Sequence, residues 1–151
     1  MTETREHAVR LQRTFNTAPP TVWRMWATAS EFAAWYGPDG ATVEVVEMDV
    51  RVGGRRHFSM SMQTPDGEMQ MWFVGEFREV DEPHRLVYTE AMADAEGTPG
   101  PGGETVVEVE FHEVGGATEI TVTHHGVPAG SPGEAGWSMA LQHLTDRLAS
   151  A

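Results

Sequence analysis

Three ionisable residues of this chain, Arg13, Glu90 and His124, lie in segments where apolar and polar residues alternate. Such alternation is typical of β-strands, in which residues two apart share a face. Each of the three shares its face with large apolar side chains, so we expect all three to point toward one interior surface. Because buried charges are costly unless they are paired, the pattern predicts an Arg13–Glu90 ion pair with His124 nearby.

This group of residues could serve chemistry in two ways. It could anchor the polar part of a ligand, or it could act in acid/base catalysis through His124, whose ordinary pKa lies near neutrality. Glu90 or Arg13 would then orient the imidazole, and Tyr88, on the strand face of Glu90, is a fourth catalytic candidate. The alternative is that these residues brace the structure or turn to solvent at strand ends.

Four methionines flank a predicted turn at Asp66-Gly67 and are followed by two aromatic residues. Methionine is flexible and suits a surface that accepts varied apolar partners, so these residues predict a pocket wall, with ordinary core packing as the alternative. The predicted ligand-binding residues are Met60, Met62, Met69, Met71, Trp72, Phe73, Tyr88, Glu90, Trp137, Leu141 and Leu144.

Composition and spacing exclude several other chemistries. The chain has no cysteine and no lysine, which excludes thiol nucleophiles, disulfides and lysine Schiff bases. His124 and His125 point to opposite faces of a strand, and no His-x-x-x-His pattern occurs. The Gly-x-Ser-x-Gly motif of serine hydrolases is also absent. We therefore expect neither a metal nor a cofactor.

The charge balance bears on the partners. A net charge of −13 repels phosphate backbones and anionic lipid surfaces, and the nearest basic patch is only Arg55-Arg56. No apolar run is long enough to span a bilayer, and residues 1–6 are polar and lack the apolar core of a signal peptide. We expect a cytoplasmic protein that binds neither nucleic acid nor membranes.

Periodicity and turn residues predict a single α+β domain over residues 1–151, with its core at about 7–149. Residues 94–104 are rich in Gly and Pro and predict a mobile loop. Gly53 and Gly54 are expected to supply positive φ angles at a strand reversal. Strands are predicted at 8–15, 42–52, 56–63, 68–80, 86–92, 106–114 and 117–125, two short helices between 20 and 36, and a long amphipathic helix at 133–149.

Four short signatures in fixed order carry a family resemblance. They are Trp35-Tyr36-Gly37-Pro38, Asp49-Val50-Arg51-Val52-Gly53-Gly54, Arg85-Leu86-Val87-Tyr88-Thr89-Glu90 and Gly136-Trp137. From about His7 to Leu148, the chain resembles the activator-of-heat-shock-protein-90-ATPase homologue-like family of the START-like (SRPBCC) superfamily. The resemblance implies a helix-grip fold, in which a seven-stranded antiparallel sheet curves around a long C-terminal helix and leaves a cavity between them.

The resemblance leaves three functions open. The first is a non-catalytic protein that binds a hydrophobic small molecule in an apolar cavity. The second is a cyclase- or aromatase-like enzyme acting on a hydrophobic or polyketide-like substrate. The third, ranked lowest, is a chaperone-associated ATPase-activator-like module with a role in stress response. The expected partner is a hydrophobic small molecule, with a homodimer as a further option, and contact with a chaperone is not expected.

Overall fold

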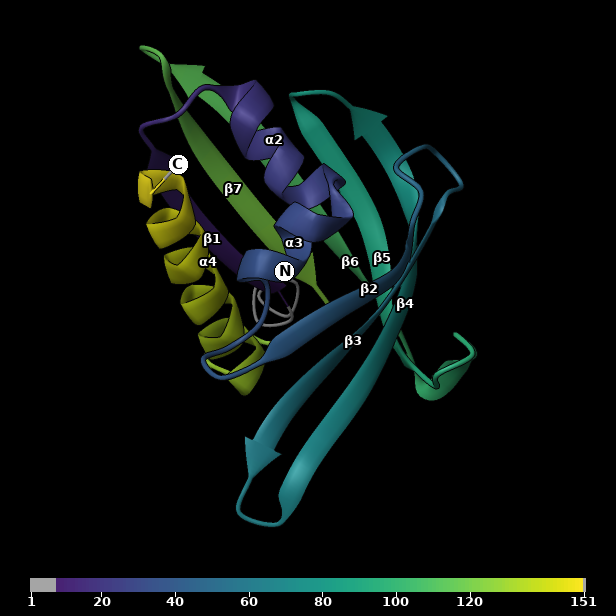
Figure 1. The fold of residues 1–151 in the computed structure, drawn as a ribbon. Coiled ribbons are helices and arrows are strands. Elements are labelled where there is room, and N and C mark those ends of the chain that lie inside the picture. The colour runs from purple at the N-terminus through teal and green to yellow at the C-terminus, as the bar shows by residue number, and fades with distance from the viewer. Residues whose placement is uncertain (1–7, 151) are drawn as a thin grey trace.

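In the computed structural model, which describes residues 8–150, seven strands pair into one curved antiparallel sheet (Figure 1). The strand order is β1-β7-β6-β5-β4-β3-β2, so the first and last strands of the described residues are neighbours. The strands are β1 (Ala8–Phe15), β2 (Thr42–Met48), β3 (Arg55–Thr64), β4 (Gly67–Asp81), β5 (Arg85–Ala93), β6 (Pro99–Val114) and β7 (Ala117–His125). The helices are α2 (Pro19–Ala27), α3 (Ala29–Trp35) and α4 (Pro132–Ser150). The predicted α+β helix-grip architecture is confirmed.

Helix α4 lies along the concave side of the sheet beside β1 and α3 (Figure 1). The predicted apolar stripe faces inward, and Leu141 and Leu144 at its centre have no exposed surface. Full burial of a leucine side chain stabilises the fold by about 1.5–3 kcal/mol. This stripe therefore holds α4 on the sheet.

The two short helices complete the concave layer with aromatic side chains. Trp23 of α2 packs on Phe111 of β6 with ring centroids 5.3 Å apart, and Phe32 of α3 packs on Phe58 of β3 at 5.4 Å. Trp35 donates a buried hydrogen bond from Nε1 to the carbonyl of Met25 at 2.8 Å, which joins the two helices. The aromatic residues thus fix both helices relative to the sheet.

Two sequence predictions about loops are wrong. The strand predicted to reach residue 52 ends at Met48, because the backbone then turns back through hydrogen bonds from Asp49 and Gly54. The predicted mobile loop at 94–104 is instead a tight turn followed by the start of β6 at Pro99. The Asp94 carboxylate accepts hydrogen bonds from the backbone N–H of Glu96 and Thr98, which closes that turn.

The two glycines at the β2–β3 reversal serve different purposes. Gly53 has a φ of +84°, as expected, but Gly54 does not have a positive φ. A Cβ on Gly54 would lie 1.9 Å from the carbonyl oxygen of Asp49. Gly54 is therefore required for space, whereas Gly53 is required for its backbone angle.

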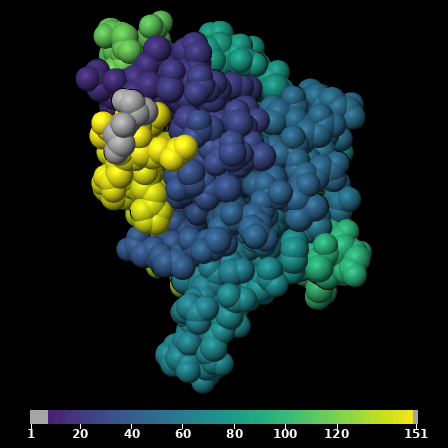
Figure 2. Space-filling model, viewed as in Figure 1, coloured from purple at the N-terminus to yellow at the C-terminus, as the bar shows by residue number. Residues whose placement is uncertain are grey.

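The β3–β4 hairpin projects beyond the rest of the molecule (Figures 1 and 2). Pairing of β3 with β2 stops at Ser61, and pairing of β4 with β5 begins at Trp72. Between these points, Met62 to Met69 form a two-stranded ribbon, which we call the arm. In the arm Met62 pairs with Met69, which is 44% exposed.

Candidate functional site

A pocket of about 140 Å³, open to solvent on one side and called the cavity below, lies between the sheet, the turn after α3 and the first half of α4. Its walls are mostly apolar, and three polar side chains reach it from three different elements. The lining residues are Tyr36, Gly37, Pro38, Met60, Glu90, His124, Val127, Gly133, Gly136, Trp137 and Ala140.

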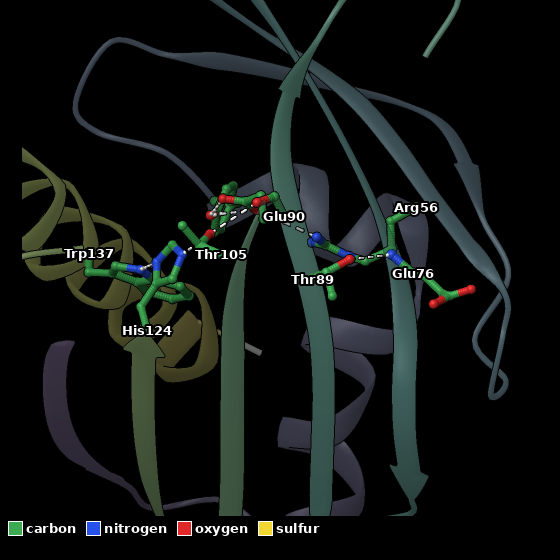
Figure 3. Close-up of polar contacts among 8 residues, drawn as sticks. Arg56, Glu76, Thr89, Glu90, Thr105, His124 and Trp137 are labelled. Carbon is green, nitrogen blue, oxygen red and sulfur yellow. Dashed lines mark hydrogen bonds and ion pairs between the residues drawn. The ribbon is translucent and has the colours of Figure 1, made fainter. Parts of the chain in front are cut away.

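The buried ion pair at this site joins Glu90 to Arg56, not to Arg13. Nη1 of Arg56 lies 3.5 Å from Oε2 of Glu90, and Arg56 is only 1% exposed (Figure 3). Arg13 is half-buried on β1 and donates to the backbone carbonyl of Gln12. The predicted Arg13–Glu90 pair is therefore wrong. Strand β1 is separated from β5 by two other strands, whereas β3 is separated from it by one.

Arg56 is enclosed by aromatic rings from α3 and the sheet. Its guanidinium carbon lies 3.9 Å from the ring centroid of Tyr88, and Phe32, Phe58 and Phe77 lie within 6 Å. Ring faces attract a cation, most strongly where water is excluded. The rings and the Glu90 carboxylate together compensate for burying this charge. Burial in the same cluster raises the pKa of Tyr88, so its hydroxyl stays protonated.

Tyr36 contacts the same carboxylate from the cavity side. Its hydroxyl lies 3.4 Å from Oε1 and 3.3 Å from Oε2 of Glu90. Burial, followed by the negative charge of Glu90, raises the pKa of Tyr36 well above its ordinary value. Tyr36 is therefore a hydrogen-bond donor to Glu90 at any physiological pH.

His124 is held in one tautomer by its neighbours. The indole N–H of Trp137 donates to Nδ1 at 3.0 Å, and because an indole nitrogen can only donate, Nδ1 must be unprotonated. Nε2 then carries the hydrogen and donates to Oγ1 of Thr105 at 2.7 Å. Thr105 in turn donates to the backbone carbonyl of Glu90 at 3.0 Å (Figure 3). This chain of hydrogen bonds connects α4, β7, β6 and β5.

The expected catalytic contact of His124 with Glu90 or Arg13 is not formed. Both ring nitrogens are engaged with Thr105 and Trp137, and the residue is 6% exposed. Burial lowers the pKa of His124, although the nearby negative charge of Glu90 acts in the opposite direction. The imidazole is thus a neutral structural link that also forms part of the cavity wall.

A family model described as Activator of Hsp90 ATPase homolog 1-like protein matches residues 16–149. The chain belongs to this family. No match to a curated protein was found.

Solved structures share the fold of this AHSA1-like chain at low sequence identity. A Chromobacterium violaceum protein is 23% identical, with a TM-score of 0.80, over 94% of this chain and 96% of its own. An Arthrobacter aurescens protein is 20% identical, with a TM-score of 0.84, over 97% and 88%. The AHSA1 protein of Silicibacter pomeroyi is 23% identical, with a TM-score of 0.73, over 94% and 97%. At these identities the comparisons show a common fold.

Several residues predicted to bind a ligand lie elsewhere in this AHSA1-like chain. Met60, Glu90 and Trp137 line the cavity, and ligand contact stays a prediction for them. Tyr88, the fourth catalytic candidate, is fully buried beneath Arg56. It does not line the cavity, and neither do Leu141 and Leu144, which pack in the core.

The methionine and aromatic run divides between three places. Met62 and Met69 belong to the arm, outside the cavity. Met71 and Phe73 are half-buried on the concave face, where they pack against the core without lining the cavity. Trp72 lies on the opposite face of the sheet, against His57 with ring centroids 5.3 Å apart. Residues adjacent on a strand face opposite ways, so Trp72 and Phe73 cannot line one surface.

Sequence analysis missed seven of the lining residues, and three of these are small residues on α4. Gly133, Gly136 and Ala140 follow the i, i+3, i+7 spacing of one helix face, and this face borders the cavity. Tyr36, also missed, lies in the Trp-Tyr-Gly-Pro signature. A search for small residues on the inward face of the last helix would have found the cavity.

Two further observations concern the described part of the chain. None of its helices combines the length and the apolar character needed to cross a bilayer. Within residues 8–150, no three His, Asp or Glu side chains are grouped so that they could hold a metal ion.

Proposed function

We propose that this chain binds a small, mostly apolar molecule in the cavity between α4 and the sheet. The proposal rests on one observation: Gly136, a glycine inside α4, lines the cavity. Glycine inside a helix is about 1 kcal/mol less favourable than alanine. A Cβ on Gly136 would have no neighbour within 4 Å, so packing does not demand a glycine there. Since Gly136 lines the cavity, the open space beside it adjoins the cavity.

The size and lining of the cavity support a compact ligand. An engineered cavity of roughly 150 Å³ in another protein stays dry and binds benzene. The cavity of about 140 Å³ is similar in volume and has mostly apolar walls, although it is open to solvent on one side. A single ring with a short substituent fits this description. The proposal stops at binding, because both ring nitrogens of His124 are engaged with protein groups.

The test is to fill the cavity from α4. Gly136→Leu places an apolar side chain in the open space and is expected to weaken binding of toluene at least about tenfold, a change of about 1.4 kcal/mol. Binding is measured through the NMR shifts of the Trp137 indole N–H. Ala135→Leu is the matched control, because Ala135 is an exposed neighbour on the same helix.

Two results would contradict the proposal. One is a wild-type protein that binds neither toluene nor any similar apolar ring. The other is a folded Gly136→Leu variant that binds toluene as tightly as the wild-type protein and the Ala135→Leu control.

A further inference from the structure

The Glu90 carboxylate borders the cavity with weak hydrogen bonds. Its side chain is 10% exposed, and its contacts with Arg56 and Tyr36 are 3.3 to 3.5 Å long. Charge-assisted hydrogen bonds are normally about 2.5–2.9 Å long. An ionised carboxylate can accept about four hydrogen bonds. Glu90 therefore has acceptor capacity that its protein neighbours satisfy poorly.

Glu90 also sets the charge of the cavity wall. Among the lining residues, Glu90 is the one acidic residue and there is no arginine. The hydrogen bond from Trp137 keeps His124 neutral. Arg56 does not line the cavity; its guanidinium lies over the ring of Tyr88 and pairs with Glu90 at 3.5 Å. A ligand in the cavity therefore contacts the Glu90 carboxylate, whereas the Arg56 counter-ion lies outside the cavity wall.

Two aromatic rings border the same space. Tyr36 and Trp137 line the cavity and pack edge to face, with centroids 5.5 Å apart. A cation that lies over the face of either ring is attracted to it, because ring faces carry negative charge. The same arrangement disfavours a carboxylate or phosphate, which Glu90 would repel.

We infer that the ligand carries a hydrogen-bond donor, best of all a protonated amine, on a small apolar body, and that the donor binds the Glu90 carboxylate. This inference rests on the proposed function, because it assigns a ligand class to the same cavity.

The experiment compares four probes built on one ring: toluene, benzyl alcohol, benzylamine and benzoate. Their affinities for the full chain are measured by calorimetry and by the Trp137 indole shift. We expect benzylamine to bind at least about tenfold more tightly than toluene, benzyl alcohol to lie between them, and benzoate to bind most weakly.

Variants then assign the preference to Glu90. Glu90→Gln keeps an acceptor for Arg56 but removes the charge, so the benzylamine affinity should fall to that of benzyl alcohol while toluene is unaffected. Glu113→Gln, at an exposed position of β6, makes the same change in net charge and should leave the order intact. If Glu90→Gln does not fold, Tyr36→Phe serves instead. It removes a competing donor to Glu90, so the preference for benzylamine should persist or grow.

The outcomes separate the two proposals. Failure of every probe, toluene included, overturns the proposed function. Binding of toluene without a preference for benzylamine, or equal binding of benzoate, overturns only the ligand class. A preference for benzylamine that Glu90→Gln leaves unchanged, or that Tyr36→Phe abolishes, also overturns the assignment to Glu90.

Discussion

Replacing Arg56 with methionine should remove a large part of the stability of the fold. Arg56 is the cation of a buried pair, so Arg56→Met leaves Glu90 buried without a counter-ion. Breaking a buried pair in this way costs about 3–5 kcal/mol. Because a domain of this size is stable by only about 5–15 kcal/mol, the variant should be close to unfolding. Methionine keeps most of the apolar length of the side chain, so lost packing is a minor part of the change.

The assay is urea unfolding followed by tryptophan fluorescence, with Arg55→Met as the matched control. Arg55 is the neighbouring residue, but its side chain is 43% exposed, lies 3.9 Å from Glu47 and donates a hydrogen bond to the carbonyl of Gly97 at 3.0 Å, which adds about 0.5–1.5 kcal/mol. An exposed pair of this kind contributes about 0–1 kcal/mol. The double variant Arg56→Met/Glu90→Gln should be more stable than the sum of the two single effects implies, because it leaves no unpaired charge. An Arg56→Met variant no less stable than Arg55→Met, or single effects that simply add, would refute this reasoning.

Three further predictions concern the same framework. Burial lowers the folded-state pKa of His124 below its ordinary value of 6.5. The unfolded state therefore binds this proton more readily than the folded state, so the free energy of unfolding should fall as the pH drops below about 6.5. His124→Gln should remove that part of the pH dependence in urea midpoints, and identical pH profiles would contradict it. Gly54→Ala should destabilise the fold by several kcal/mol, because the added Cβ would overlap the Asp49 carbonyl. Gly53→Ala should destabilise the fold by only about 1–2 kcal/mol, through backbone strain. Equal melting temperatures for the two variants would contradict this prediction. Thr105→Val removes the hydroxyl between His124 and β5 and should cost about 1–3 kcal/mol, measured by thermal unfolding, with a neutral result counting against the hydrogen-bond chain.

The fold was predictable from the sequence because its signals are local. Alternation marks strands such as β1 and β7, and the leucine stripe marks the inward face of α4. Alternation also assigned Glu90 and His124 correctly to the inner face. Local periodicity was therefore enough to predict the architecture.

The ion pair was not predictable in the same way, because it depends on strand order. Alternation cannot decide between Arg13 and Arg56 as the partner of Glu90. Neighbouring strands lie about 4.8 Å apart, so β1, three strands away from β5, is about 14 Å distant, whereas β3 is about 10 Å away. Arg56 also lies opposite Gly75 on the intervening strand, where no side chain obstructs the guanidinium. These are facts of tertiary register that no local pattern contains.

The pairing of β1 with β7 has a consequence for how the chain folds during translation. Ala8 pairs with His125, and Trp23 of α2 packs on Phe111, so β1 and α2 must wait for partners that are synthesised much later. At about 5–20 residues per second, synthesis of the 117 residues that follow Ala8 up to His125, or of the 88 residues that follow Trp23 up to Phe111, takes on the order of 10 s. Until then the tryptophans of α2 have no sheet to cover them. Completion of the sheet thus depends on the synthesis of β7, and a ribosome that stalls before β7 would leave β1 without its partner strand.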